Sequence, residues 1–253
     1  MDYLIIILLG LIIGSFLNVI ILRFDELKTI FNVRSHCPKC KKKLPWYDLV
    51  PLFSFVLLKG KCRQCKEAIS FQYPLVEALT AGLFALCLYK FGLTLDLALW
   101  LIISSVMIVI FVYDIQHLLI SDILVVILGV VWLALILKNY FIFHNTQLVL
   151  QSLYGGLVLG GFLGLLVLIS RGKWMGSGDI GLGFVIGALL GWPLVLVAGF
   201  GSFMVGTIVS IVFLALKSMK LKSQMPFAPF LIVGLYLALL FGERLIAWYW
   251  GYI

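Results

Sequence analysis

The stretch that decides the fold is YLIIILLGLIIGSFLNVIIL, Tyr3 to Leu22, which contains no charged side chain. A helix needs about 20 predominantly apolar residues to cross the hydrocarbon core of a bilayer. A secretory signal peptide is the alternative, but no basic residue precedes this apolar core and no small-residue cleavage site follows it. We therefore expect a retained first transmembrane helix.

The rest of the chain is also strongly apolar. Of its 253 residues, 63% are hydrophobic and 12% are charged, with a mean hydropathy of +1.17, whereas ordinary soluble domains are about 45–50% apolar. We divide the long apolar run over 180–216 at Gly191-Trp192-Pro193, because proline breaks a helical hydrogen-bond ladder. The composition predicts an all-α polytopic membrane protein with about eight transmembrane helices. The further helices are expected at about 74–93, 97–113, 118–137, 148–170, 180–193, 195–216 and 227–247.

The distribution of lysine and arginine predicts the orientation, because these residues are retained on the cytoplasmic side. With eight spans and an outside N-terminus, 16 of the 19 basic residues fall in inside segments, and the first such segment runs from Arg23 to Lys66. The net charge of +8 is then a topology and membrane-surface signal, for which anionic lipid head groups are sufficient partners. No nucleic acid is expected as a partner.

Four of the five cysteines lie in the one sizeable polar segment, as CPKC and CRQC. Two C-x2-C pairs suit a tetrahedral zinc ion, because each pair presents two thiolates to one metal. Two disulfides are the alternative, but they are rare in the reducing cytoplasm. We expect a small cytoplasmic loop domain that holds structural zinc through Cys37, Cys40, Cys62 and Cys65.

Acidic residues inside membrane segments are functional candidates, because burying their charge is expensive. Asp114, Asp122 and Asp179 all fall near the cytoplasmic face in this topology. Two carboxylates that share one proton can act together on a peptide bond, one as base and the other as acid. Gly176 and Gly178 in MGSGD would let an extended peptide backbone approach Asp179. On its own, this motif is better explained by a helix N-terminus with an acidic cap.

Two other classes of function stay open at this point. A transporter could use membrane-embedded aspartates as a proton relay. A membrane receptor could sense zinc through its cysteine loop. Loss of cleavage, of solute flux or of zinc-dependent signalling in aspartate-to-asparagine variants would distinguish a peptidase, a transporter and a receptor.

Eight segments stand out along the chain: GSFLNVIILR (14–23), CPKC, LPWYDLVPLFSF, GKCRQC, ISFQYPLVE, YDIQHLLISD, MGSGDIGL and MPFAPFLIVG (225–234). In this order they resemble the type IV prepilin peptidases, which are bifunctional leader peptidases and N-methyltransferases. The resemblance covers nearly the whole chain. An intramembrane peptidase of presenilin type shares the glycine and aspartate motif but does not need the cysteine pairs.

The resemblance implies a membrane aspartic peptidase with Asp114 and Asp179 as the catalytic pair. Its substrates would be prepilins or pseudopilins, cleaved at the cytoplasmic face of the bacterial inner membrane. S-adenosylmethionine would then supply a methyl group to the new N-terminus. Asp122 receives no catalytic role, and the oligomeric state stays open.

The chain departs from the family pattern at three positions. Ser121 stands where the family often has proline, Gly181 where it often has lysine, and Ala228 where it often has glycine. None of these changes removes a carboxylate. We expect three parts: a first transmembrane helix over 1–23, the loop domain over 24–73, and a membrane peptidase domain over 74–253.

Overall fold

The computed structural model describes residues 1–24, 35–144, 146–216 and 224–251. It divides into two compact units, residues 1–109 and residues 110–253, with the division inside one helix. The three-part division expected from the sequence stays a prediction. Lys217, Lys220 and Lys222, which contribute to the predicted orientation, lie outside the described residues.

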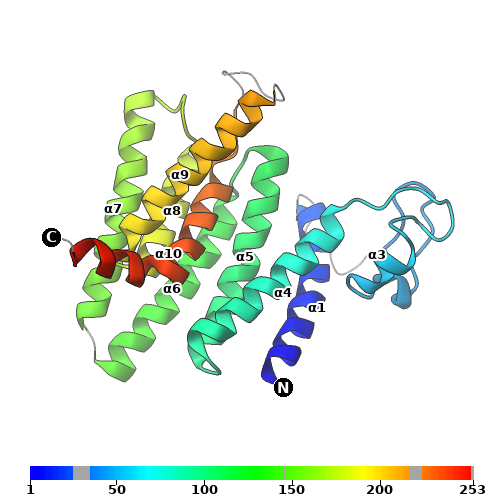
Figure 1. Cartoon of the computed structure of the whole chain (residues 1–253), viewed down its shortest axis with the longest axis horizontal. Coiled ribbons are helices and arrows are strands. Elements are labelled where there is room, and N and C mark those ends of the chain that lie inside the picture. Colours follow the sequence, from blue (N-terminus) through cyan, green and yellow to red (C-terminus); the bar gives the residue numbers. More distant parts are fainter. Residues whose placement is uncertain (25–34, 145, 217–223, 252–253) are drawn as a thin grey trace. The chain divides into compact units, whose positions relative to one another are not determined.

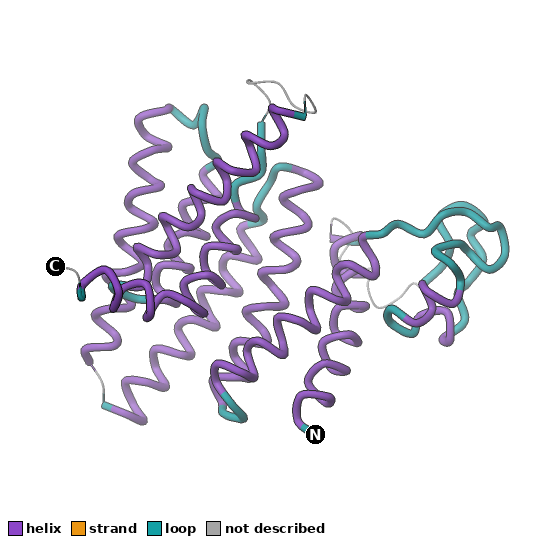
Figure 2. Tube along the Cα trace, viewed as in Figure 1, coloured by secondary structure: helices purple, strands orange, loops and turns teal. Residues whose placement is uncertain are grey.

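The described residues form helices and loops without a strand (Figures 1 and 2). The predicted all-α polytopic fold is thereby confirmed. Two short elements, η2 and α3, lie in the loop between the first two long helices. The bounds are α1 Asp2–Leu22, η2 Trp46–Leu49, α3 Phe53–Leu57, α4 Gln72–Phe91, α5 Leu95–His117, α6 Asp122–Phe143, α7 Thr146–Ser170, α8 Ser177–Leu190, α9 Leu194–Ala215 and α10 Ala228–Trp250.

Among the described residues, seven helices are long and apolar enough to cross a membrane. The eighth apolar helix, α8, has only 14 residues, which corresponds to about 21 Å of helix. The hydrocarbon core is about 30 Å thick. The sequence therefore gives the number of apolar helices, but α8 is too short to be a full crossing.

In the first unit, α1 and α4 lie side by side (Figure 1). A Cβ atom on Gly10 would lie 2.6 Å from Ala81 Cα, and one on Gly14 would lie 2.7 Å from Glu77 Cα. These distances leave no room for a side chain. Small residues thus bring the two helix backbones together, as in other membrane helix pairs.

In the second unit, α7 packs against α8, and α9 packs against α10. A Cβ atom on Gly155 would meet the backbone of Gly187 and would lie 2.8 Å from Gly191 Cα. Gly155 is therefore a packing position in the contact between α7 and α8. This close contact fixes the direction of α8, whose first turn carries Asp179.

Candidate functional site

Asp114 lies in the last turn of α5, three residues before its end at His117. The sequence places it at the end of a helix that stops at about residue 113, but α5 continues past it. Its side chain is buried, with 4% exposure. The backbone N–H of Ala228, the first residue of α10, donates a hydrogen bond to Asp114 Oδ2 over 3.2 Å. A residue far along the chain thus holds one oxygen of this carboxylate.

Asp179 lies in the first turn of α8 and is 6% exposed. The backbone N–H of Gly176, the residue at the helix N-cap, donates to Asp179 Oδ2 over 3.2 Å. This is the side-chain half of a capping box, in which the third helical residue reaches back to the cap. The positive end of the helix dipole also favours a carboxylate at this position.

The structure brings the two aspartates together. Both belong to the second unit, and the charge of the Asp114 carboxylate acts on that of Asp179. Among the described residues, no lysine, arginine or histidine forms an ion pair with either carboxylate. Two buried acids from different helices therefore lie within electrostatic range of one another, and no ion pair among the described residues neutralises either, the arrangement that allows a pair to share one proton.

The two glycines before Asp179 have different surroundings. A Cβ atom on Gly178 would lie 2.9 Å from Ile120 Cβ, whereas one on Gly176 would meet only Asp179 Oδ2, at 3.8 Å. Gly178 is therefore required by packing against the segment between α5 and α6. Gly176 has space beside it, so packing does not account for glycine there. Their expected role in substrate binding stays a prediction.

The three departures from the family pattern have structural correlates. Ser121 is the N-cap of α6, which begins at the exposed Asp122. A Cβ atom on Gly181 would lie 3.1 Å from Val125 Cγ1. Ala228 is completely buried and supplies the N–H that binds Asp114. That N–H is a backbone group, so the type of residue at position 228 does not reveal this hydrogen bond in the sequence.

The second candidate site is the cysteine cluster of the loop domain. The four Sγ atoms of Cys37, Cys40, Cys62 and Cys65 lie within 4.8 Å of one another, and all four thiols are free. The Cys37 and Cys65 sulfurs are 3.8 Å apart. Four sulfurs at about 2.3 Å from a tetrahedral zinc ion would be separated by about 3.8 Å. The cluster can therefore hold a metal ion, and its size fits zinc.

The two C-x2-C segments have the same backbone form. The Cys37 N–H bonds Lys42 O and the Cys62 N–H bonds Glu67 O. Each turn ends on a lysine with positive φ, Lys41 at 55° and Lys66 at 60°. The backbone N–H groups of Cys65 and Gln64 lower the pKa of the Cys62 thiol to about 7. Thiolate is the form that binds a metal.

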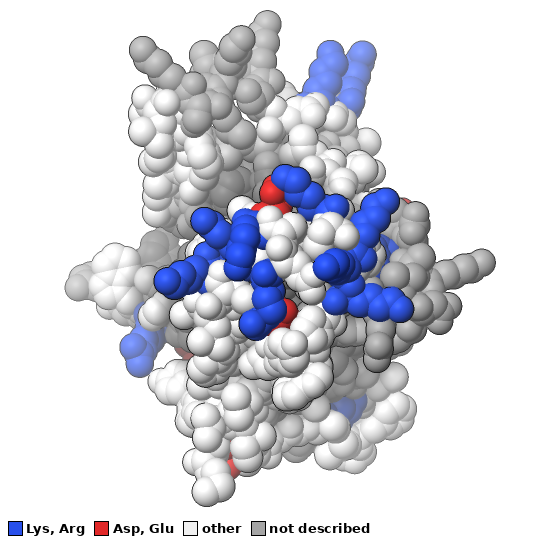
Figure 3. All heavy atoms as spheres, turned by 90° about the vertical axis from the view of Figure 1, so that its right-hand side faces the viewer, with Lys and Arg blue, Asp and Glu red and all other residues white. Residues whose placement is uncertain are grey.

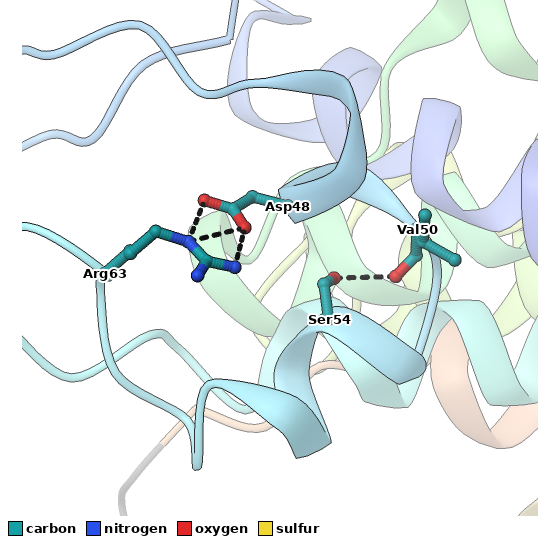
Figure 4. A network of polar contacts seen from close by, with 4 residues as sticks. All are labelled: Asp48, Val50, Ser54 and Arg63. Atoms are coloured by element: carbon teal, nitrogen blue, oxygen red, sulfur yellow. Dashed lines mark hydrogen bonds and ion pairs between the residues drawn. The ribbon is translucent and has the colours of Figure 1, made fainter.

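Polar contacts hold the loop domain together around this cluster. Arg63 donates to both carboxylate oxygens of Asp48 in η2, with the shortest bond at 2.7 Å (Figure 4). The Ser54 hydroxyl donates to the Val50 carbonyl over 2.6 Å in the same view. Lys39 of the first cysteine pair forms an ion pair with Glu67, just after the second pair. These contacts link the two cysteine segments to each other and to η2.

Glu77 has a role that the sequence does not reveal. Its position near the start of α4 is typical of an acid at the positive end of a helix. In the structure it is 6% exposed, and its Oε2 accepts the backbone N–H of Leu52 over 2.8 Å. Glu77 therefore ties the start of α3 to α4.

Comparison with known proteins identifies the family of this chain. The family model described as Bacterial Peptidase A24 N-terminal domain matches residues 8–91, and that of the Type IV leader peptidase family matches residues 101–211. The chain belongs to the type IV leader peptidase family. The suspected resemblance is thus confirmed. The N-terminal family model includes the cysteine cluster, the leader peptidase model includes both aspartates, and Ala228 lies beyond it.

Curated leader peptidases are similar over nearly their full length. Proteins named "Prepilin leader peptidase/N-methyltransferase" from Legionella pneumophila and Bacillus subtilis are 33% and 35% identical to this chain. The alignments cover 99% and 95% of this chain, and 95% and 94% of those relatives. The Pseudomonas aeruginosa protein of the same name is 31% identical over 94% of this chain and 90% of its own. No solved structure matches. These relatives and the apolar helices identify a multi-pass protein of the bacterial inner membrane.

Proposed function

We propose that this chain is a membrane aspartic endopeptidase that removes leader peptides from type IV prepilins and pseudopilins. The observation that carries the proposal is the burial of Asp114 and Asp179 in the same unit, where no basic side chain among the described residues forms an ion pair with either carboxylate. The names of the relatives support the class of substrate. Membership of a leader peptidase family favours this function over a transporter or a receptor.

The geometry suggests how the pair would act. One oxygen of each carboxylate accepts a backbone N–H, from Ala228 in one case and from Gly176 in the other. These bonds orient the two acids, and the second oxygen of each is left for proton transfer. At any moment one carboxyl is ionised and the other carries the shared proton, because two adjacent negative charges repel each other.

In this mechanism the ionised carboxylate takes a proton from a water molecule as the water oxygen attacks the scissile carbonyl carbon. The protonated carboxyl gives its proton to the carbonyl oxygen. The tetrahedral intermediate then collapses, the C–N bond breaks, and the leaving nitrogen takes up a proton. The products are a leader with a free carboxylate and a mature protein with a new amino terminus.

The side of the membrane follows from the basic residues. We place the loop domain, the end of α5 and the start of α8 on the cytoplasmic side, because the segment from Arg23 to Lys66 holds most of the positive charge. With α1 entering from outside, both Asp114 and Asp179 then lie near the cytoplasmic face. Cleavage would take place where a substrate helix leaves the bilayer.

Zinc in the cysteine cluster would act as a structural cross-link. Cys37, Cys40, Cys62 and Cys65 would hold it, and their four thiolates would leave no open position for catalysis. Bound metal would stabilise a loop domain that has almost no apolar core of its own.

The second activity we propose is N-methylation of the new amino terminus. It rests on the double name of the relatives. S-adenosylmethionine would supply the methyl group. We assign no residue to the methyl transfer.

The experiment that tests both activities is mass spectrometry of a prepilin substrate incubated with the purified protein in lipid vesicles. A peptidase yields the free leader and the mature chain. Added S-adenosylmethionine should make the mature chain heavier by one methyl group. An uncut substrate would refute the peptidase, and a cut but unmethylated product would refute the methyl transfer alone.

A further inference from the structure

The loop domain carries an exposed apolar surface that takes no part in the proposed peptidase mechanism. Phe53, Val56 and Leu57 lie at positions i, i+3 and i+4 of α3, which places them on one face of the helix. Their exposed fractions are 64%, 72% and 79%. Trp46, before α3, is 79% exposed. A polar cytoplasmic loop would not leave such side chains in water without a partner.

A hydrogen bond fixes the level of this surface along α4. The N–H of Leu52, directly before α3, donates to Glu77 Oε2 over 2.8 Å. Glu77 is the sixth residue of α4, a helix that can span the membrane, so it lies about 8 Å from the start of that helix. The start of α3 is therefore held at the level where α4 enters the bilayer.

Positive charge lies next to the apolar face. Lys59 and Lys61 lie shortly after the end of α3, beyond its C-cap Leu58, and both are exposed. The Gly60 N–H between them donates to the Phe55 carbonyl of α3 over 2.9 Å, so the backbone that carries both lysines is bonded to the helix. Figure 3 shows lysine and arginine side chains gathered on one face of the molecule.

The loop domain as a whole is also positively charged. Residues 35–71 hold eight basic and two acidic side chains. Both acids, Asp48 and Glu67, are already paired with Arg63 and Lys39. Four thiolates around a divalent zinc would add two negative charges, and the segment would remain positive.

From these observations we propose that α3 is a membrane-surface anchor. Phe53, Val56 and Leu57 enter the head-group region beside α4, and Lys59 and Lys61 contact anionic lipid head groups. Short amphipathic segments bind in this way when apolar burial and attraction to anionic lipid act together. Tryptophan at such a boundary is also typical of membrane proteins. The anchor does not depend on the proposed peptidase activity.

The test uses the full chain with photoreactive benzoylphenylalanine at Val56, reconstituted in vesicles of phosphatidylethanolamine and phosphatidylglycerol. Illumination should attach lipid at Val56, as it should at Leu150, an exposed position on the spanning helix α7. The same label at Gln64, an exposed residue between Cys62 and Cys65, should attach far less lipid. A cross-link from Val56 to a prepilin or to another part of the chain, or no cross-link, would overturn the proposal.

Two changes test what holds the anchor in place. Glu77→Ala removes the acceptor of the Leu52 N–H and should lower lipid labelling at Val56 several-fold. Glu77→Gln keeps a side-chain oxygen and should preserve the labelling. If labelling with Glu77→Ala equals that with Glu77→Gln, the hydrogen bond does not position α3.

The lipid composition tests the role of charge. Each lysine near an anionic surface strengthens the association about fivefold. Labelling at Val56 should therefore fall in vesicles of phosphatidylcholine, and in the anionic vesicles when Lys59 and Lys61 are both changed to glutamine. Unchanged labelling in both cases would refute the contact with anionic head groups.

Discussion

The backbone N–H of Ala228 donates a hydrogen bond to Asp114 Oδ2 over 3.2 Å, so the start of α10 holds a carboxylate from the end of α5. The first N–H groups of a helix have no partner within that helix. Ala228 can therefore bond a side chain from another helix at no cost to α10. The orientation of Asp114 thus depends on a residue beyond the part of the chain that matches the leader peptidase family model.

Removing this N–H should reduce peptidase activity. Ala228→Pro lacks the donor, and a hydrogen bond to a charged group contributes about 1.5–3 kcal/mol. We expect cleavage of a prepilin substrate to fall roughly ten- to a hundred-fold. Ala228→Gly keeps the donor and should retain activity. Equal cleavage by the proline and glycine variants in a time-course assay would show that the bond is not needed.

The two glycines before Asp179 should respond differently to alanine. Gly178→Ala places a Cβ atom 2.9 Å from Ile120 Cβ, so we expect a lower unfolding temperature as well as reduced cleavage. Gly176→Ala has the space it needs and should fold normally. If Gly176→Ala also cleaves normally, the expected role of Gly176 in admitting the substrate backbone is wrong.

Removal of any one cysteine of the cluster should release the metal. We expect elemental analysis to find one zinc per chain in the unchanged protein and much less in Cys62→Ser. Cys87→Ala is the matched control, because Cys87 is buried beside Ser104 in the membrane helices and is not part of the cluster. Structural zinc sites stabilise small domains by about 10–16 kcal/mol.

Chelation should therefore unfold the loop domain, as limited proteolysis of residues 35–71 would detect. Cleavage of prepilin by Asp114 and Asp179 should continue, since neither residue belongs to the cluster. Full zinc content in Cys62→Ser would contradict the assignment of the four thiols as ligands.

Packing between α7 and α8 should be sensitive to one methyl group. A Cβ atom on Gly155 would collide with the backbone of Gly187, and overpacking of this kind costs about 1–3 kcal/mol. Gly155→Ala should therefore lower the thermal stability of the protein in detergent. Gly161, on the same helix, has open space beside it, so Gly161→Ala should leave stability unchanged or raise it. The opposite order would exclude close backbone contact at Gly155.

Much of the helical architecture is predictable because long apolar runs give the number and approximate position of the helices. Their ends are less accessible to sequence analysis. The stretch from Asp114 to Asp122 is apolar enough to suggest a helix starting at about residue 118, yet α5 extends to His117 and α6 begins at Asp122 with Ser121 as its cap. Local capping and turn geometry decide these boundaries, and hydropathy does not report them.

The candidate residues are predictable to the extent that they depend on side-chain type. A bare acid in a membrane segment and two C-x2-C pairs have chemistry that is visible in the sequence. The N–H donors of Ala228 and Gly176 are backbone groups, present at every residue except proline, and only the fold selects them. Glu77 is similar, because its partner is the backbone of Leu52 in a separate loop.

The central claim is that Asp114 and Asp179 act as one catalytic pair. The most direct measurement compares cleavage of a prepilin substrate by the unchanged protein, Asp114→Asn, Asp179→Asn and the control Asp122→Asn, whose side chain is exposed. Amide replacement keeps the size of the side chain but removes its acid–base function, which contributes about 10²–10⁴-fold to rate. We predict a loss of that order in each of the first two variants, with unchanged folding, and near-normal cleavage by Asp122→Asn. Normal cleavage by Asp114→Asn or Asp179→Asn would contradict the account.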